Sequence, residues 1–325
     1  MDRRWPWALA LLVFSPVCAE YLWGYDDTTG DALVLLGGLL IFVPLYGAPA
    51  LLIREAAVRL GLHWPGVLLL AAAAGLVEAG LVDQSMFSTS YRDIPYWDDI
   101  TVPTAIEPLG ISVYTALTFV GGHVVLSFGA PIAIVEGLAG SAGRRPWLGR
   151  VGLAVTAFFY LAAAGLVLGD HLNSEADHAS ATQVAVTGAV VVLLVRAALA
   201  TRRWRLGPSP GGVPGPWLLG LGVLAVASGY TILPPSAAGT AALELLALAT
   251  IFTLVGLSRR DGWSRAHTIT VAGGALVAAG IGAFWTTPLG DVPAAAKYAH
   301  NAALLLLVAV LTVAAVRRAE GVSMR

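Results

Sequence analysis

The sequence predicts an all-α fold, a polytopic bundle of about ten transmembrane helices. Of its 325 residues, 57% are hydrophobic and 12% are charged, whereas soluble globular domains carry about 25% charged residues. The apolar residues gather in stretches of about 20, the length that crosses roughly 30 Å of hydrocarbon as a helix. The loops between these stretches alternate in the sign of their charge. Together the three observations predict an integral membrane protein that lies in the lipid bilayer.

Ten stretches are long and apolar enough to be predicted spans. In chain order they cover residues 5–23, 32–53, 66–85, 110–137, 151–169, 182–200, 216–233, 237–257, 268–287 and 294–316. The first stretch is also typical of a signal peptide, because its basic start and short apolar core are followed by small residues before Glu20. Cleavage after residue 19 leaves nine spans in the same orientation, so both alternatives stay open.

The charge of the loops predicts the orientation of the chain. One set of loops is basic and holds Arg3/Arg4, Arg54/Arg59, Arg144/Arg145/Arg150, Arg202/Arg203/Arg205, Arg259/Arg260/Arg265 and Arg317/Arg318/Arg325. The other set is acidic and holds Asp26/Asp27/Asp31, Asp83, Asp93, Asp98, Asp99, Glu107, Asp170, Glu175, Asp177 and Asp291. Basic loops stay in the cytoplasm, so we expect a multi-pass protein of the plasma (inner) membrane with both termini cytoplasmic. Six tryptophans, including Trp64 and Trp263, fall near the predicted cytoplasmic ends, where interfacial aromatic residues gather.

Two longer connections predict how the bundle is divided. The Gly/Pro-rich segment 207–216, "GPSPGGVPGP", is predicted to be a cytoplasmic linker. It separates an N-terminal bundle of about six spans (1–206) from a C-terminal bundle of about four (217–325). The outer loop 86–109 carries enough aromatic residues and prolines to pack as a cap, although a solvated loop is an equal alternative.

Three ionisable residues are expected near the middle of the membrane. At a rise of 1.5 Å per residue, Glu78 lies about 16 Å above the inner edge of its span, His123 about 12–14 Å and Glu20 about 18 Å. An ionised side chain at that depth costs about 2.5–3.5 kcal/mol, so such residues face a partner or a water-filled cavity. We therefore expect Glu78 and His123 to share a proton, with Glu20 close by.

Prolines and glycines next to these residues predict broken helices. Pro44 and Pro49 lie within the second span, where each removes a backbone hydrogen bond. A helix that breaks inside the membrane commonly lines a binding site, which makes Tyr46 a candidate binding residue. Pro131 precedes Glu136, a fourth candidate for acid–base or proton-relay work. The alternative is that these are packing and kink residues, since Gly and Pro are common in membrane helices.

A second polar group is predicted in the C-terminal spans. Glu244 in the eighth span and His300 with Asn301 in the tenth lie about 9 Å from the outer edge, and they form a candidate substrate-binding group. The alternative is a structural contact that holds the C-terminal bundle together. Glu55, between Arg54 and Arg59, is interpreted as one half of an interfacial ion pair.

Two motifs resemble those of the CAAX-protease and bacteriocin-processing family of intramembrane peptidases. In "VEAGLVDQ", Glu78 matches the first acid of that family's paired glutamates, and in "FVGGH" the spacing from Phe119 to His123 matches its second motif. Ala79 stands where the second glutamate belongs, and the following arginine is absent. The resemblance covers about 50 residues and implies a peptidase-like activity. Over its whole length the chain resembles uncharacterised polytopic membrane proteins of high-GC bacteria.

Three classes of function follow from these residues. The favoured one is a proton-coupled transporter of a small solute, with Glu78 as the proton-binding group, because it uses the most residues. The second is an intramembrane hydrolase with Glu78 as base and His123 as partner. The third is a membrane scaffold or accessory subunit. Substrate, cofactor, metal and oligomeric state stay open, because two ligands are too few for a dependable zinc site.

The composition also excludes some classes. The arginines occur in twos and threes between apolar runs, which is not the pattern of a nucleic-acid surface. Cys18 is the single cysteine, so an intramolecular disulfide and a multi-cysteine metal site are excluded.

Overall fold

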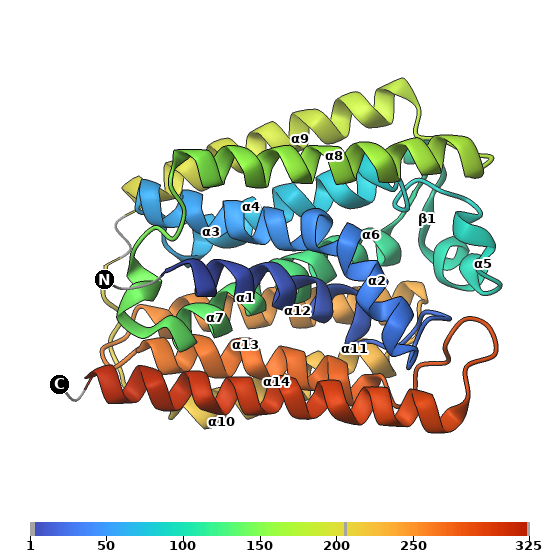
Figure 1. The fold of residues 1–325 in the computed structure, drawn as a ribbon. Helices are drawn as coiled ribbons and strands as arrows, with labels where there is room; N and C mark the ends of the chain where they lie inside the picture. The colour runs from blue at the N-terminus through green and yellow to red at the C-terminus, as the bar shows by residue number, and fades with distance from the viewer. Residues whose placement is uncertain (1–3, 205–206, 324–325) are drawn as a thin grey trace.

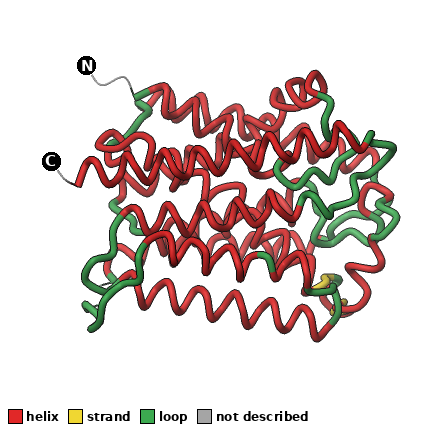
Figure 2. The backbone as a smooth tube through the Cα atoms, turned by 90° about the horizontal axis from the view of Figure 1, so that it is seen from below, coloured by secondary structure: helices red, strands yellow, loops and turns green. Residues whose placement is uncertain are grey.

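The computed structural model describes residues 4–204 and 207–323. Its helices run alongside one another as a bundle, and the loops gather at the two ends (Figures 1 and 2). The beginning of the first helix and the end of the last lie at the same end of the bundle (Figure 1). We call this the terminal end and the opposite one the capped end. The loop charges predict an even number of crossings, which stays a prediction.

The first part of the chain forms helices that are repeatedly interrupted. They are α1 (Trp5–Pro16), η1 (Val17–Tyr21), α2 (Ala32–Phe42), η2 (Val43–Gly47), α3 (Ala48–Leu60), α4 (Trp64–Val77), η3 (Glu78–Val82), α6 (Val113–Gly122), η7 (His123–Gly129), α7 (Ala130–Ala139) and η8 (Gly140–Arg144). Asp31 accepts hydrogen bonds from the first turn of α2, and Gly61 ends α3 with a φ of +65°, which glycine adopts without strain.

Five of the remaining eight helical elements have 18 to 30 residues, and the other three are shorter. The eight elements are α8 (Arg150–Ser174), α9 (Ala181–Ala200), η9 (Thr201–Arg203), α10 (Pro216–Ala227), α11 (Gly229–Ile232), α12 (Ala237–Ser258), α13 (Arg265–Gly282) and α14 (Ala294–Ser323). A capping box at Ser180 and Gln183 begins α9, and Ser236 caps α12. Proline opens α10, where its missing N–H has no helical partner to lose.

Seven helices in the described part of the chain are long and apolar enough to cross a membrane. They are Ala32–Leu60, Trp64–Val82, Val113–Arg144, Arg150–Ser174, Ala181–Arg203, Ala237–Ser258 and Ala294–Gly321. The other three predicted spans also fall on helices, at 5–21, Pro216–Ile232 and Arg265–Gly282. The all-α fold is therefore confirmed, while the count of ten crossings stays a prediction.

One hydrophobic core joins the two parts of the chain. Its buried side chains run from Ala8 and Leu11 in α1 to Ala315 and Val316 in α14. Helix α7 lies at its centre and packs against α1, α13 and α14. The predicted division at 207–216 is therefore a boundary in sequence, across which the core is continuous.

The connection 86–109 packs against the capped end. It contains η4 (Tyr91–Asp93), α5 (Trp97–Thr101), η5 (Val102–Thr104), η6 (Glu107–Leu109) and the strand β1 (Ala105–Ile106), which pairs antiparallel with β2 (Ile111–Ser112) just after the connection. The indole of buried Trp97 donates to the Ser88 carbonyl at 2.9 Å and stacks on Phe119. Asp177, from the next loop, accepts hydrogen bonds from Ser88 and Thr89. These contacts attach the loop to the bundle as the cap alternative predicts, while most of residues 91–109 is exposed, as a solvated loop would be.

Candidate functional site

Four helical spans of the N-terminal part carry a π-helical turn, which lies between two α-helices in two of them and forms the last turn in the other two. These turns are η1, η2, η3 and η7. A π-helical turn inserts an extra residue into an α-helix and is frequent at functional sites. Proline favours such turns because it cannot donate the i→i−4 hydrogen bond. Pro16 directly precedes η1, and Pro44 lies within η2.

Each π-helical turn carries one of the candidate site residues predicted from the sequence. Glu20 lies in η1 and Tyr46 in η2, while Glu78 and His123 are the first residues of η3 and η7. We call these four residues the Glu78 cluster. Prolines and glycines predicted irregular helices near Tyr46 and His123, and the structure adds the π-helical last turns that carry Glu20 and Glu78.

His123 is held by an aromatic stack and by a hydroxyl. Its ring stacks on Tyr46 with the ring centroids 5.7 Å apart and the planes at 24°. Its Nδ1 lies 3.1 Å from the Ser127 hydroxyl. Pro131 cannot donate to the carbonyl of Ser127 one turn earlier, and that carbonyl accepts the Ser15 hydroxyl at 2.6 Å. The broken helices η2 and η7 are thus tied to α1 through groups that a regular helix would have used itself.

Glu20 connects the cluster with the capped end. The hydroxyl of Tyr25 donates to the Glu20 carboxylate at 2.8 Å, and the hydroxyl of Tyr46 faces the same carboxylate. Beyond Tyr25, Asp26 pairs with Arg92 of the cap at 3.4 Å. Polar groups therefore follow one another from the cap to the middle of the bundle.

Glu78 is buried without full hydrogen bonding. Only 2% of the residue is exposed, and its Oε1 has no hydrogen-bond partner among the described residues. The hydroxyl of Tyr160 on α8 faces the carboxyl group, and the charged groups that act on it are the carboxylates of Asp83 and Glu20. A buried polar atom without a partner is rare in native structures and calls for an explanation.

The structure brings Glu78 and His123 into one cluster without a hydrogen bond between them. Helix α4 crosses η7 so closely at Gly75 that a Cβ there would lie 2.8 Å from the His123 Cβ. Glu78 follows Gly75 by one helical turn, yet the polar partner of His123 is Ser127. The shared proton that the sequence predicts therefore has no direct hydrogen bond to carry it in this conformation.

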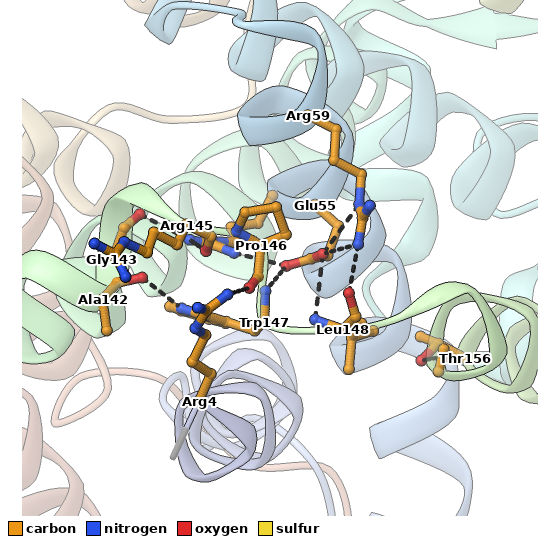
Figure 3. A network of polar contacts seen from close by, with 12 residues as sticks. Arg4, Glu55, Arg59, Ala142, Gly143, Arg145, Pro146, Trp147, Leu148 and Thr156 are labelled. Atoms are coloured by element: carbon orange, nitrogen blue, oxygen red, sulfur yellow. Dashed lines mark hydrogen bonds and ion pairs between the residues drawn. The ribbon is translucent and has the colours of Figure 1, made fainter. Parts of the chain in front are cut away.

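The structure places Glu136 in a different cluster, at the terminal end. Its Oε1 accepts from Arg54 Nε at 3.0 Å, and Arg54 also donates to Glu55 at 2.6 Å. Figure 3 shows Glu55 facing the loop 143–148, where it accepts from the backbone of Trp147 at 2.7 Å, and facing Arg59 at 3.1 Å. We call these four charged residues and this loop the Glu55 network.

The Glu55 network is densely hydrogen-bonded. Arg54 is 1% exposed and Glu55 is 0% exposed, and the Arg54 guanidinium lies 3.7 Å from the centre of the Trp147 ring. Arg54 Nη2 also donates to the carbonyls of Gly143 and Arg145. The predicted ion pair of Glu55 with Arg54 and Arg59 is confirmed. The backbone loop that completes it lies about 90 residues away in sequence, and no local pattern identified it.

The structure separates the three residues of the predicted C-terminal group. Glu244 is exposed on α12. His300 Nε2 lies 2.8 Å from the Tyr21 carbonyl, and the Asn301 amide donates to the Ala283 carbonyl at 2.8 Å. His300 and Asn301 thus connect α14 to η1 and α13, and they match the structural alternative.

No group of three histidine, cysteine, aspartate or glutamate side chains in the described part of the chain is placed to hold a metal ion.

The apolar helices and continuous core define a multi-pass helical membrane protein. Residues 9–319 match the family model described as an uncharacterized membrane protein family, and the chain belongs to this family. No curated protein and no solved structure matches the chain. The family match does not test the resemblance to the CAAX-protease family, which stays a prediction.

Proposed function

We propose that the protein is a proton-coupled transporter of a small solute, and that Glu78 is the carboxylate that takes up and releases the proton. The observation that carries this proposal is the buried Glu78 Oε1 without a hydrogen-bond partner. A carboxyl group inside a membrane bundle marks an ion or proton pathway by default. A carboxyl group that served only to tie helices together would have both oxygens bonded, as Glu55 does.

The π-helical turns favour the proposal that the protein changes conformation at the Glu78 cluster. Irregular backbone inside the membrane is tolerated where protein buries it or where it lines a cavity. In transporters, discontinuous helices meet at the substrate and ion sites near the midplane. Here η2 and η7 interrupt two helical spans, η1 and η3 form the last turns of two others, and each of the four turns carries a residue of the Glu78 cluster. Opening and closing of these turns would alternate the access to Glu78.

The polar groups toward the cap support proton entry from the capped end. Tyr25 and Glu20 are hydrogen-bonded, and the Asp26–Arg92 ion pair lies next to them at the edge of the cap. By the loop charges this end faces away from the cytoplasm, in the plasma membrane. The proton would pass from the outer side to Glu20 and then to Glu78.

Reconstituted protein in liposomes with an entrapped pH-sensitive dye tests the proposal. A panel of amino acids, sugars and small organic ions is added outside, in the presence and absence of a pH gradient. The wild type is expected to acidify the lumen with at least one of them. Glu78→Gln, which keeps the size of the side chain, is expected to reduce this flux to the level of empty liposomes.

Glu107→Gln is the matched control, because Glu107 is an exposed carboxylate in the cap. It is expected to transport like the wild type. Undiminished proton-coupled uptake by Glu78→Gln would refute the assignment of the proton to this carboxylate. A panel without any proton-coupled solute, tested at both orientations of the gradient, would refute the transporter.

A further inference from the structure

A cleft of about 290 Å³ opens at the terminal end of the bundle, beside the Glu55 network. It lies between the first turn of α4, the last turns of α7 and the first turn of α13. The side chains that define it are Trp64, Glu136, Trp263, Arg265 and Thr268. One water molecule needs a cavity volume of about 10–15 Å³, so the cleft has room for a small polar group.

Two opposite charges line the cleft without pairing with each other. Glu136 Oε1 is held by Arg54, and Arg265 Nη1 donates to the Gly140 carbonyl at 2.7 Å. Among the described residues, Glu136 and Arg265 do not form an ion pair. Each side chain is thus fixed by one hydrogen bond and keeps further polar atoms: Glu136 Oε2, which accepts, and the remaining guanidinium N–H groups of Arg265, which donate.

Two tryptophans place the cleft at the depth of the lipid headgroups. Trp64 is the first residue of α4, and Trp263 directly precedes the N-cap of α13 and stacks on His267 at 5.1 Å. Tryptophan gathers at the membrane–water interface because it has an apolar body and one N–H donor. A ligand in this cleft therefore has its polar part between Glu136 and Arg265 and its apolar part in the bilayer.

We propose that the cleft binds the phosphoethanolamine headgroup of a membrane phospholipid. The Arg265 guanidinium matches the geometry of a phosphate and donates two parallel hydrogen bonds to it. Glu136 Oε2 accepts a hydrogen bond from the ammonium group. A choline headgroup has no N–H to donate, and a glycerol headgroup has no positive charge to set against Glu136. Glu136 therefore selects the ethanolamine headgroup, while Arg265 binds any phosphate.

Thermal unfolding of the detergent-purified full chain with added lipid tests this site. Phosphatidylethanolamine is expected to raise the Tm by several degrees, and phosphatidylcholine and phosphatidylglycerol by less. Native mass spectrometry is expected to show a retained phosphatidylethanolamine molecule. Soluble O-phosphoethanolamine separates the two sources of the headgroup: a shift with the soluble compound and none with the lipid would overturn the assignment to the bilayer.

Three variants examine the residues, and one serves as control. Thr268→Leu narrows the cleft and removes no charge, so it is expected to reduce the lipid shift even where the charge variants fold poorly. Arg265→Gln is expected to lose the response to all three lipids, and Glu136→Gln to respond equally to ethanolamine and choline lipids. Arg202→Gln, at an exposed arginine of the same end, is expected to behave like the wild type. An intact preference for phosphatidylethanolamine in Thr268→Leu would overturn the proposal.

Discussion

The Glu55 network and the Glu78 cluster are two buried polar groups in neighbouring parts of the same helices, and they differ in how far they are hydrogen-bonded. In the Glu55 network, both carboxylate oxygens of Glu55 are bonded to arginines and to backbone N–H groups. In the Glu78 cluster, one carboxylate oxygen has no partner among the described residues. Burial is therefore the same in both groups, and the number of hydrogen-bonded carboxylate oxygens is what differs. Under the proposed function, this difference would separate the structural Glu55 from the proton-binding Glu78.

The largest expected effect is on stability, from Glu55→Gln. This change removes the negative charge between Arg54 and Arg59 and leaves the buried Arg54 guanidinium with Glu136 as its remaining carboxylate partner. Breaking one side of a buried ion pair costs about 3–5 kcal/mol. Reversible unfolding in mixed detergent micelles measures this loss. Glu78→Gln is the comparison, and it is expected to unfold like the wild type because it breaks no ion pair.

Equal destabilisation by Glu55→Gln and Glu78→Gln would erase the distinction between the two groups. Such a result would mean that Glu78 is also a structural acid. It would then count against the proposed proton site independently of any flux measurement.

An intermediate effect on stability is expected from Gly75→Ala, which adds a methyl group against His123 without changing the polar groups of the Glu78 cluster. The new Cβ would lie 2.8 Å from the His123 Cβ, so α4 and η7 must separate. Overpacking of this kind costs about 1–3 kcal/mol. Gly121→Ala is the matched control, because a Cβ at Gly121 meets nothing within 4 Å and alanine favours a helix over glycine by about 1 kcal/mol.

Unfolding and flux measurements on both glycine variants separate packing from function. Gly75→Ala is expected to lose stability and flux together, whereas Gly121→Ala keeps both. A Gly75→Ala protein as stable and as active as Gly121→Ala would show that the close contact of α4 with His123 does not position the cluster.

The smallest effect is expected where the cap meets Asp177, a carboxylate of the next loop that is hydrogen-bonded like Glu55 but lies outside the membrane spans. Burial raises the pKa of Asp177, but the hydrogen bonds from Thr89 and Ser88 outweigh it, and the pKa lies below its ordinary value. A lowered carboxyl pKa contributes stability that is complete above about pH 4 and is lost as the pH falls through the folded-state value. Proteolysis of the cap is therefore expected to accelerate below about pH 4.

Asp177→Asn removes this titration. Its cap is expected to be cleaved at a rate that no longer changes over the same pH range and that equals the acid rate of the wild type. A cap in wild type that resists proteolysis equally at pH 3 and pH 7 would contradict the role of Asp177.

Helices and depth could be predicted from the sequence, whereas side-chain partners could not. Every predicted span coincides with a helix of the structure. Hydrophobicity and length, which the sequence gives directly, decide whether a segment can cross the bilayer. Counting residues from the span ends brought Glu20, Glu78 and His123 to one level. The same count placed Glu244 beside His300, but depth gives no rotation about the helix axis, and Glu244 is exposed on α12.

The π-helical turns were only partly foreseeable. Prolines predicted a break near Tyr46, because proline removes a specific backbone hydrogen bond. No proline lies within α4 near Glu78, and η3 forms there through packing against neighbouring helices. The partner of Glu55 in the loop 143–148 and the cleft at Glu136 depend in the same way on segments that are distant in sequence.

The contact between His300 and Tyr21 spans 279 positions of the chain, and α14 covers the face of α7 that the earlier helices leave open. Helix α14 is synthesised after α7, so this face of α7 lies against lipid until α14 has been made and inserted. The contacts of α1 and α7 with α14 therefore form only after all the helices between them have been made.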